Sequence, residues 1–479
     1  MNEQVLKGIE PAMVMQYFEE ICSIPHGSGN IQAISDYLVS YAVEKGLRYV
    51  QEPCGNVIIF KEASPGYESE PGIILQGHMD MVAVWDDDCR IDMLTDGLEL
   101  FLSDGLVGAK GTSLGGDDGI ALAYAMAILA DDSIPHPALE FVATINEETG
   151  MDGAIMLDTS VLRGRRLINI DSEEEGSFLT GCAGGATLRL RIPTVRTEAT
   201  GKYFSVRVDG LQGGHSGTEI HKNRANAILI LARVLRALKK QMDYSLVRID
   251  GGTKDNAIPV SAEAVICCVE KPELSRVEES FRNALSGKED GISITATPCV
   301  CAESILSPET EKAVLDLLTT IPFGVAAMST LPGLVETSDN VGIIRTGEDC
   351  IEIATSVRSM IESEKEALCE KISTLAALCG ATVARNSEYP GWQYRMVSPL
   401  REKAIVAYRE LYGAMPKVET IHAGLECGLL IEKLPDLDAI SMGPDIYDIH
   451  TTKERLNIAS VQRTLELLKG ILAKKDCVL

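Results

Sequence analysis

The chain has 479 residues, which exceeds the roughly 250–300 residues at which a single core stops growing, so two or more domains are expected. Apolar residues make up 45% of it, as in an ordinary globular protein. It contains 44 Lys and Arg and 70 Asp and Glu, which gives a net charge of −26. This charge argues against binding to nucleic acid or anionic membranes, because both attract Lys and Arg.

The cysteines and the N-terminus bear on location. There are 13 cysteines, an odd number, without a C-x-x-C pair, and many lie in apolar runs, where a free Cys acts as a small hydrophobic residue. The first eleven residues lack the apolar stretch of a signal peptide, and no apolar run approaches the roughly 18 residues of a membrane span. We therefore expect a reduced, cytoplasmic protein.

The first third of the chain alternates between strands and helices. Its predicted strands are 57–60, 73–76, 139–145 and 167–170, and its predicted helices are two within 10–46, one at 120–129 and one at 154–162. Such alternation is typical of a mainly parallel sheet covered by helices.

The pattern changes near Gly184. Residues 187–194 and 203–209 alternate with period two, as half-exposed antiparallel strands do, and an apolar face with helical spacing follows at 228–238. A later helix is predicted to begin with Ser363 and Glu366 as a capping box. After residue 389 strand and helix alternate again, and we predict a catalytic α/β domain of residues 1–186 and 390–479 with an inserted α+β lid domain of residues 187–389.

The strand at 73–76 is followed by His78 and Asp80, which share a face because strand positions i and i+2 point the same way. His78 can therefore bind a metal while Asp80 holds its other ring nitrogen, as is usual for metal-bound imidazoles. Taken alone, such a pair is more often an ordinary strand end.

More acidic residues follow later strands: Asp117, Asp118, Glu147, Glu148 and Asp171, with His450 near the C-terminus. Each carboxylate taken singly is more often a solvated loop residue. Together, imidazoles and carboxylates without thiolates suit Zn²⁺, Co²⁺ or Mn²⁺, and they suffice for two metals bridged by a carboxylate and a water. Adjacent Glu147 and Glu148 can divide the work, one binding metal and one acting as general base.

The motifs also resemble those of the di-zinc metallopeptidases that include carboxypeptidase G, the acetylornithine and succinyl-diaminopimelate deacylases and the carnosinases. Within that group the chain is most similar to the aminoacyl-histidine dipeptidase (cytosolic non-specific dipeptidase) branch. The resemblance extends over nearly the whole chain, through residues 76–82, 114–119, 147–151, 169–176, 181–185, 213–217, 256–259, 421–428 and 443–446.

The resemblance implies a role for each matching residue. Asp117 would bridge two Zn²⁺ ions, with Co²⁺ or Mn²⁺ as substitutes; His78 and Asp171 would complete one metal site, and Glu148 and His450 the other. The remaining implied roles are general base for Glu147, orientation of His78 for Asp80, oxyanion stabilisation for His215, carboxylate binding for Arg358, and substrate contacts for His215, Asn256 and Gly424. The lid would also form a homodimer.

The sequence departs from the family pattern beside the site. Gly116 and Asp118 replace the usual Ala and Asn around the bridging Asp, Asn146 replaces an Asp, and residues 451–452 are Thr-Thr instead of Ser-Pro. None of these changes removes a predicted ligand, but Asp118 adds a carboxylate and leaves metal preference and optimum pH open.

The predicted function is metal-dependent hydrolysis of unblocked dipeptides, including Xaa-His and β-alanyl-histidine. The alternatives are a tripeptidase or an N-acyl amino acid deacylase of the same superfamily, and a binding protein that has lost activity. Intact Glu147, Asp117 and His215 argue against the last.

Overall fold

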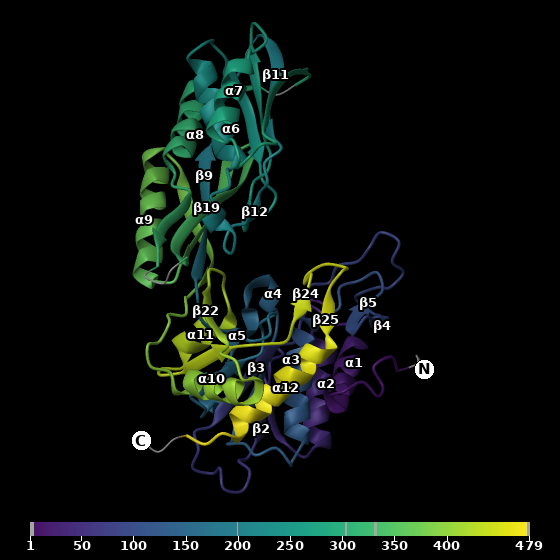
Figure 1. Cartoon of the computed structure of the whole chain (residues 1–479). Coiled ribbons are helices and arrows are strands. Elements are labelled where there is room, and N and C mark those ends of the chain that lie inside the picture. The colour runs from purple at the N-terminus through teal and green to yellow at the C-terminus, as the bar shows by residue number, and fades with distance from the viewer. Residues whose placement is uncertain (1–3, 199, 302–303, 330–332, 477–479) are drawn as a thin grey trace. The chain divides into compact units, whose positions relative to one another are not determined.

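The computed structural model describes residues 4–198, 200–301, 304–329 and 333–476 (Figure 1). The chain forms two compact units. Unit 1 comprises Met1–Gly181, Tyr394–Thr420 and Leu425–Leu479, and unit 2 comprises Cys182–Gln393 and Ile421–Gly424. The short segment Ile421–Gly424 therefore belongs with unit 2, which the sequence pattern did not indicate.

Unit 1 contains the larger part of an eight-stranded sheet. In spatial order its strands are β1 (Arg48–Gln51), β2 (Val57–Lys61), β6 (Leu139–Thr144), β3 (Ile73–His78), β7 (Arg166–Asn169), β23 (Asp438–Ser441), β8 (Ser177–Cys182) and β22 (Lys417–Ile421). The four central strands, β6, β3, β7 and β23, run parallel, whereas β1, β2 and β8 pair antiparallel. This is the predicted α/β class, with parallel pairing limited to the centre.

A smaller sheet of unit 1 contains β24 (Ile446–Tyr447), β25 (Arg455–Asn457), β5 (Leu106–Ala109) and β4 (Leu100–Ser103). The helices of unit 1 are α1 (Ala12–Cys22), α2 (Gln32–Glu44), α3 (Gly116–Ala130), α4 (Glu147–Gly150), α5 (Asp152–Met156), α10 (Pro399–Tyr412), α11 (Glu426–Lys433) and α12 (Ile458–Ala473), with a 3₁₀ turn at Thr159–Val161.

Helix α3 forms the centre of the unit 1 core. Every residue from Gly116 to Leu129 is buried, and the helix packs against α1 and β3. Its small and apolar residues suit an element that faces protein on all sides, because no face is left for polar side chains. The N-terminus of this helix is therefore held firmly at the end of β3.

Unit 2 is built on an antiparallel sheet that helices cover on one face (Figure 1). In spatial order its strands are β16 (Ser293–Cys299), β11 (Lys202–Asp209), β15 (Ala262–Cys268), β13 (Ser245–Gly251), β19 (Val335–Thr346), β20 (Cys350–Ser359), β9 (Gly184–Pro193) and β21 (Thr382–Tyr389), with β18 (Gly324–Met328) beside β19. The helices are α6 (Ala227–Lys239), α7 (Ser275–Ala284), α8 (Pro308–Thr320) and α9 (Glu362–Leu378), with a 3₁₀ turn at Ile220–Lys222.

Two short strand pairs complete unit 2: β10 (Arg196–Thr197) with β17 (Ile305–Leu306), and β12 (Gly214–His215) with β14 (Ala257–Ile258). Among the described residues, no helix is both long and apolar enough to cross a bilayer. None of the twelve cysteines in the described part of the chain forms a disulfide bond with another of them.

Candidate active site

The acidic residues predicted from strand ends converge in unit 1. His78 ends β3, Glu147 and Glu148 open α4 directly after β6, and Asp171 follows β7. Because β3, β6 and β7 run parallel, their C-terminal ends meet at one edge of the sheet. Asp117 reaches the same edge from the start of α3.

Asp117 lies between two imidazoles. Its Oδ1 is 3.1 Å from His78 Nε2, and its Oδ2 is 3.1 Å from His450 Nε2. Asp171 Oδ1 lies 3.7 Å from the same nitrogen of His78, and Glu148 Oε1 lies 2.7 Å from that of His450. The structure thus brings all five predicted ligands together as two groups that share Asp117.

This donor set fits two metal ions. Around a tetrahedral ion with ligand bonds of about 2.0–2.1 Å, neighbouring ligand atoms lie roughly 3.3 Å apart, and the contacts of Asp117 are close to that value. His78 Nδ1 lies 2.9 Å from the carbonyl oxygen of Asp80, so it carries the proton and Nε2 offers its lone pair. The groups in this site whose ligand atoms lie close enough to hold a metal ion are His78 with Asp118 and Asp171, His78 with Glu147 and Glu148, and Asp117 with Glu148 and His450.

The ionisable groups of the cluster shift one another's pKa values. Burial opposes ionisation of Asp117, but its contacts with His450 and His78 lower the pKa of that carboxyl group. Burial likewise lowers the pKa of His450, yet hydrogen bonding to Asp117 and Glu148 raises it to about 10 overall. The carboxylates therefore create a negative potential between the two imidazoles, which favours a bound cation.

Asp80 supports two members of the cluster. Besides the carbonyl contact to His78, its Oδ1 lies 3.5 Å from His78 Nδ1 and accepts a hydrogen bond from Glu147 N at 3.0 Å. Its Oδ2 accepts a second hydrogen bond from Ser28 Oγ at 2.7 Å. Asp80 therefore contacts His78 through its backbone as well as its side chain, and it also holds the start of α4.

The side chain of Glu147 is the free carboxylate of the pair. Within the described residues it accepts no hydrogen bond, whereas Glu148 faces His450. Burial raises the pKa of the Glu147 carboxyl group well above its usual value. A carboxylate with a raised proton affinity beside a metal site is suited to accept a proton.

Asp118, the departure from the family pattern, faces inward. It is buried, and its Oδ2 accepts a hydrogen bond from His78 N at 3.1 Å. Gly77 provides the room, because a Cβ atom on Gly77 would lie 2.5 Å from that oxygen. Asp118 thus connects the start of α3 to the end of β3 through the backbone of His78.

Two buried carboxylates that the sequence did not indicate lie beside the cluster. Glu454 accepts hydrogen bonds from four successive backbone N–H groups, those of residues 114–117. Glu426 accepts from Gln76 Nε2 at 2.6 Å and Thr144 Oγ1 at 2.7 Å, and burial raises its pKa to about 7. Only the position of Glu426 in a family-like motif could have signalled it.

The predicted substrate-binding residues lie in unit 2, and His215 is poised as a donor. Its Nδ1 faces the backbone N–H groups of Gly217 and Thr218 at 3.2 and 3.0 Å, so Nδ1 is the unprotonated nitrogen and Nε2 carries the proton. Burial and the nearby charge of Arg358 lower the pKa of His215 to about 4. It is therefore neutral near pH 7.

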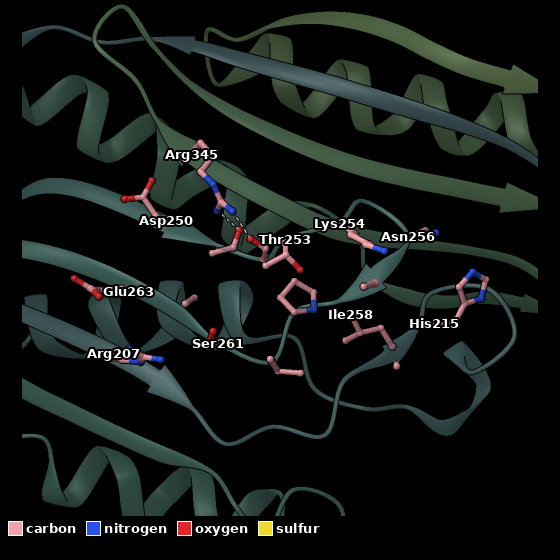
Figure 2. Close-up of a pocket in the computed structure, with 17 residues that line it drawn as sticks. Arg207, His215, Asp250, Thr253, Lys254, Asn256, Ile258, Ser261, Glu263 and Arg345 are labelled. Carbon is pink, nitrogen blue, oxygen red and sulfur yellow. Dashed lines mark hydrogen bonds between the residues drawn. The ribbon is translucent and has the colours of Figure 1, made fainter. Parts of the chain in front are cut away.

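His215 and Asn256 both line a cavity of about 650 Å³ in unit 2. Figure 2 shows His215 toward one end of this cavity and Arg207 and Glu263 toward the other. Arg345 borders it and donates to the carbonyl oxygen of Gly251 at 2.7 Å, which holds the loop that leads to Asn256.

Arg358 and Gly424 belong to a second cluster in unit 2. Arg358 Nη1 donates to Tyr389 Oη at 2.9 Å, and Gly424 packs against the ring of Tyr389. His422 Nε2 lies 2.7 Å from Ser338 Oγ, and Ser338 is the β-sheet partner of Arg358. The four predicted substrate-binding residues thus lie in two places within unit 2. Gly217 lies between His215 and His422, because a Cβ atom on Gly217 would lie 2.4 Å from the carbonyl oxygen of His422 and 2.9 Å from His215 Cε1.

Comparisons with known proteins agree with this architecture. Residues 206–289 match the family model "Peptidase dimerisation domain". The chain is 37% identical to the cytosol non-specific dipeptidase of Escherichia coli strain K12, over 98% of this chain and 99% of that protein. Its structure matches the aminoacylhistidine dipeptidase of Vibrio alginolyticus with a TM-score of 0.86 and 33% identity, over 98% of this chain and 99% of the other.

More distant structures share the fold alone, such as the aminopeptidase PepT of Bacillus cereus, with a TM-score of 0.57 and 18% identity over 97% of this chain and 98% of the other. The predicted α/β fold and family resemblance are confirmed by the full-length relatives. The chain therefore belongs to the M20 metallopeptidases, in the family of the cytosol non-specific and aminoacylhistidine dipeptidases.

Proposed function

We propose that this protein is a metal-dependent dipeptidase that hydrolyses unblocked dipeptides, Xaa-His and β-alanyl-histidine among them. The observation that carries the proposal is Asp117, whose two oxygen atoms face His78 and His450 at 3.1 Å each, with the unpaired carboxylate of Glu147 nearby. The two relatives that match this chain over nearly their full length are both named as dipeptidases, which supports the same substrate class.

The proposed metal ligands are His78, Asp171 and Asp117 for one ion, and Glu148, His450 and Asp117 for the other, with Zn²⁺ as the proposed metal and Co²⁺ or Mn²⁺ as substitutes. When bound, such ions lower the pKa of a shared water and polarise the substrate carbonyl. Imidazole and carboxylate donors without thiolates suit these ions.

The chain's own groups would move the proton and stabilise the developing charge. Glu147 accepts a proton from the attacking water and passes it to the leaving amine, which its raised pKa favours. His215, neutral with its proton on Nε2, donates a hydrogen bond to the oxyanion. Asp80 positions both His78 and Glu147.

Unit 1 would be the catalytic domain and unit 2 the lid that recognises the substrate. Arg358 would bind the C-terminal carboxylate of the dipeptide, while Asn256 and Gly424 would contact its backbone. The dimerisation-domain match within unit 2 supports a homodimer formed through the lid. A cytoplasmic location agrees with the lack of disulfide bonds among the described cysteines.

The test is hydrolysis of β-alanyl-histidine, Leu-His, Gly-Leu, a tripeptide and an N-acetyl amino acid, before chelation, after chelation and after addition of Zn²⁺, Co²⁺ or Mn²⁺. We expect cleavage of the free dipeptides only, lost on chelation and restored by metal. Cleavage of the tripeptide or the acetylated compound instead would move the protein to a tripeptidase or deacylase function.

A further inference from the structure

Four residues on neighbouring strands of unit 2 form one row across the sheet. Ser338 on β19 pairs with Arg358 on β20, Arg358 pairs with Gly185 on β9, and Gly185 pairs with Tyr389 on β21. Paired residues in adjacent strands project from the same face. Arg358 and Tyr389 therefore flank a glycine on one face of the sheet.

The missing side chain of Gly185 lets its two neighbours meet. Arg358 and Tyr389 lie two strands apart, yet Arg358 Nη1 donates to Tyr389 Oη at 2.9 Å. A Cβ atom on Gly185 would lie 2.5 Å from Tyr389 Oη, and one on Gly424 would lie 2.6 Å from the same ring. The tyrosine ring is thus fixed between two glycines, and its hydroxyl group is fixed against Arg358.

This hydrogen bond leaves one edge of the guanidinium group free. Nη1 is directed at Tyr389, whereas Arg358 Nε is shielded from solvent and has no hydrogen-bond partner in the described part of the chain. Nor does any described carboxylate form an ion pair with Arg358. A buried donor without a partner costs stability, and the Nε–Nη2 edge of Arg has the geometry that grips a carboxylate through two hydrogen bonds.

The surroundings are arranged for an anion. Burial, with a further contribution from the charge of Arg358, lowers the pKa of both neighbouring imidazoles, to about 4 for His215 and about 3 for His422. Both imidazoles are therefore neutral at neutral pH, and Arg358 is the cation of this cluster.

We propose that Tyr389 is a positioning residue that, through the gap left by Gly185, holds Nη1 of Arg358 and so turns the Nε–Nη2 edge of Arg358 toward the C-terminal carboxylate of the substrate. This inference rests on the proposed dipeptidase function and names the group that selects free dipeptides over C-terminally blocked ones.

The experiment measures binding separately from turnover. Gly-Leu and Gly-Leu amide are titrated calorimetrically into the full-length, Zn²⁺-loaded Glu147→Gln protein, with and without Tyr389→Phe. We expect the Glu147→Gln protein to prefer the free acid, and Tyr389→Phe to reduce that preference about tenfold, as loss of a hydrogen bond to a charged group does. Tyr203→Phe, a tyrosine of β11 in the same sheet, is the matched control and should change nothing.

Gly185→Ala gives an independent second variant, because it keeps the hydroxyl group but displaces the ring. It should reduce the acid-over-amide preference like Tyr389→Phe. An unchanged preference in Tyr389→Phe, or no preference before that substitution, would overturn the inference. Hydrolysis of Gly-Leu by the unmodified protein reports separately on the proposed function, so the two can fail independently.

Discussion

Glu454 is joined to the backbone of Asp117 although the two residues are far apart in the chain. Glu454 Oε1 accepts from Gly116 N at 2.8 Å and from Asp117 N at 3.3 Å, while Oε2 accepts from Leu114 N at 2.8 Å and Gly115 N at 3.1 Å. Glu454 also follows His450 in the loop between β24 and β25. One carboxylate therefore connects the two segments that carry Asp117 and His450.

Glu454→Gln should weaken metal binding. The substituted amide places an N–H₂ group against backbone N–H groups, so the segment before Asp117 loosens. Residues that position metal ligands typically contribute about 10–100-fold in affinity, and we expect a loss of this size. Competition with a chromogenic chelator measures it, with exposed Glu402→Gln as control; equal affinity in Glu454→Gln and the unmodified protein would refute the coupling.

Glu147→Gln should separate chemistry from metal binding. Removal of the general base costs about 10²–10⁴-fold in rate, whereas the proposed ligands stay intact. We therefore expect two bound metal ions and strongly reduced kcat. Glu148→Gln is the contrasting variant, because it should lose metal; parent-like turnover in Glu147→Gln would assign the base elsewhere.

Gly77→Ala should destabilise unit 1. The added methyl group would lie 2.5 Å from both Asp118 Oδ2 and Ala121 Cβ, in a region without free space. Overpacking of this kind costs about 1–3 kcal/mol, and thermal unfolding measures it. Gly105→Ala is the comparison variant. It measures the cost of a side chain at a positive φ without crowding, since nothing lies within 4 Å of the Cβ position of Gly105. A melting temperature unchanged by Gly77→Ala would contradict the packing described here.

Stability should fall with acidification through His422. Burial and the charge of Arg358 lower its pKa to about 3 in the folded protein, against roughly 6.5 when unfolded. Below pH 6.5 the unfolded chain takes up a proton that the folded chain does not, so this contribution is complete above pH 6.5 and is lost as the pH falls toward 3.

The measurement is the melting temperature between pH 7.5 and 4.5 for the unmodified protein and His422→Gln. Glutamine can keep a hydrogen bond to Ser338 but has no titrating group. We expect a shallower decline in the variant. Parallel curves would show that the proton uptake of His422 does not contribute.

The cluster of unit 1 could be predicted from the sequence because most of its residues directly follow a recognisable strand. His78, Glu147, Glu148 and Asp171 each follow an apolar strand, and parallel strands bring their C-terminal ends together. Glu454 could not be predicted in this way, because its partners are backbone groups 337 to 340 residues away. Because every residue except proline has a backbone N–H group, the sequence does not show which of these groups a carboxylate will bind.

Tyr389 was missed for another reason. Strand β21, which it ends, is mostly exposed and lacks apolar alternation, so only its pairing with β9 reveals it. The capping box predicted at Ser363 and Glu366 was wrong. Helix α9 begins at Glu362 without a side-chain cap, and Glu366 instead accepts two hydrogen bonds from Arg385. A tertiary ion pair there outcompetes the local motif.

The order of strands in unit 1 has a consequence for synthesis on the ribosome. Strand β7 pairs with β3 on one side and with β23 on the other, and Arg166 of β7 is in register with Asp438 of β23. All of Cys182–Gln393 is therefore translated while one edge of β7 is unpaired. An open strand edge invites pairing with other chains. Nascent chains that end before residue 438 should thus depend on chaperones, and this dependence should end once β23 has emerged.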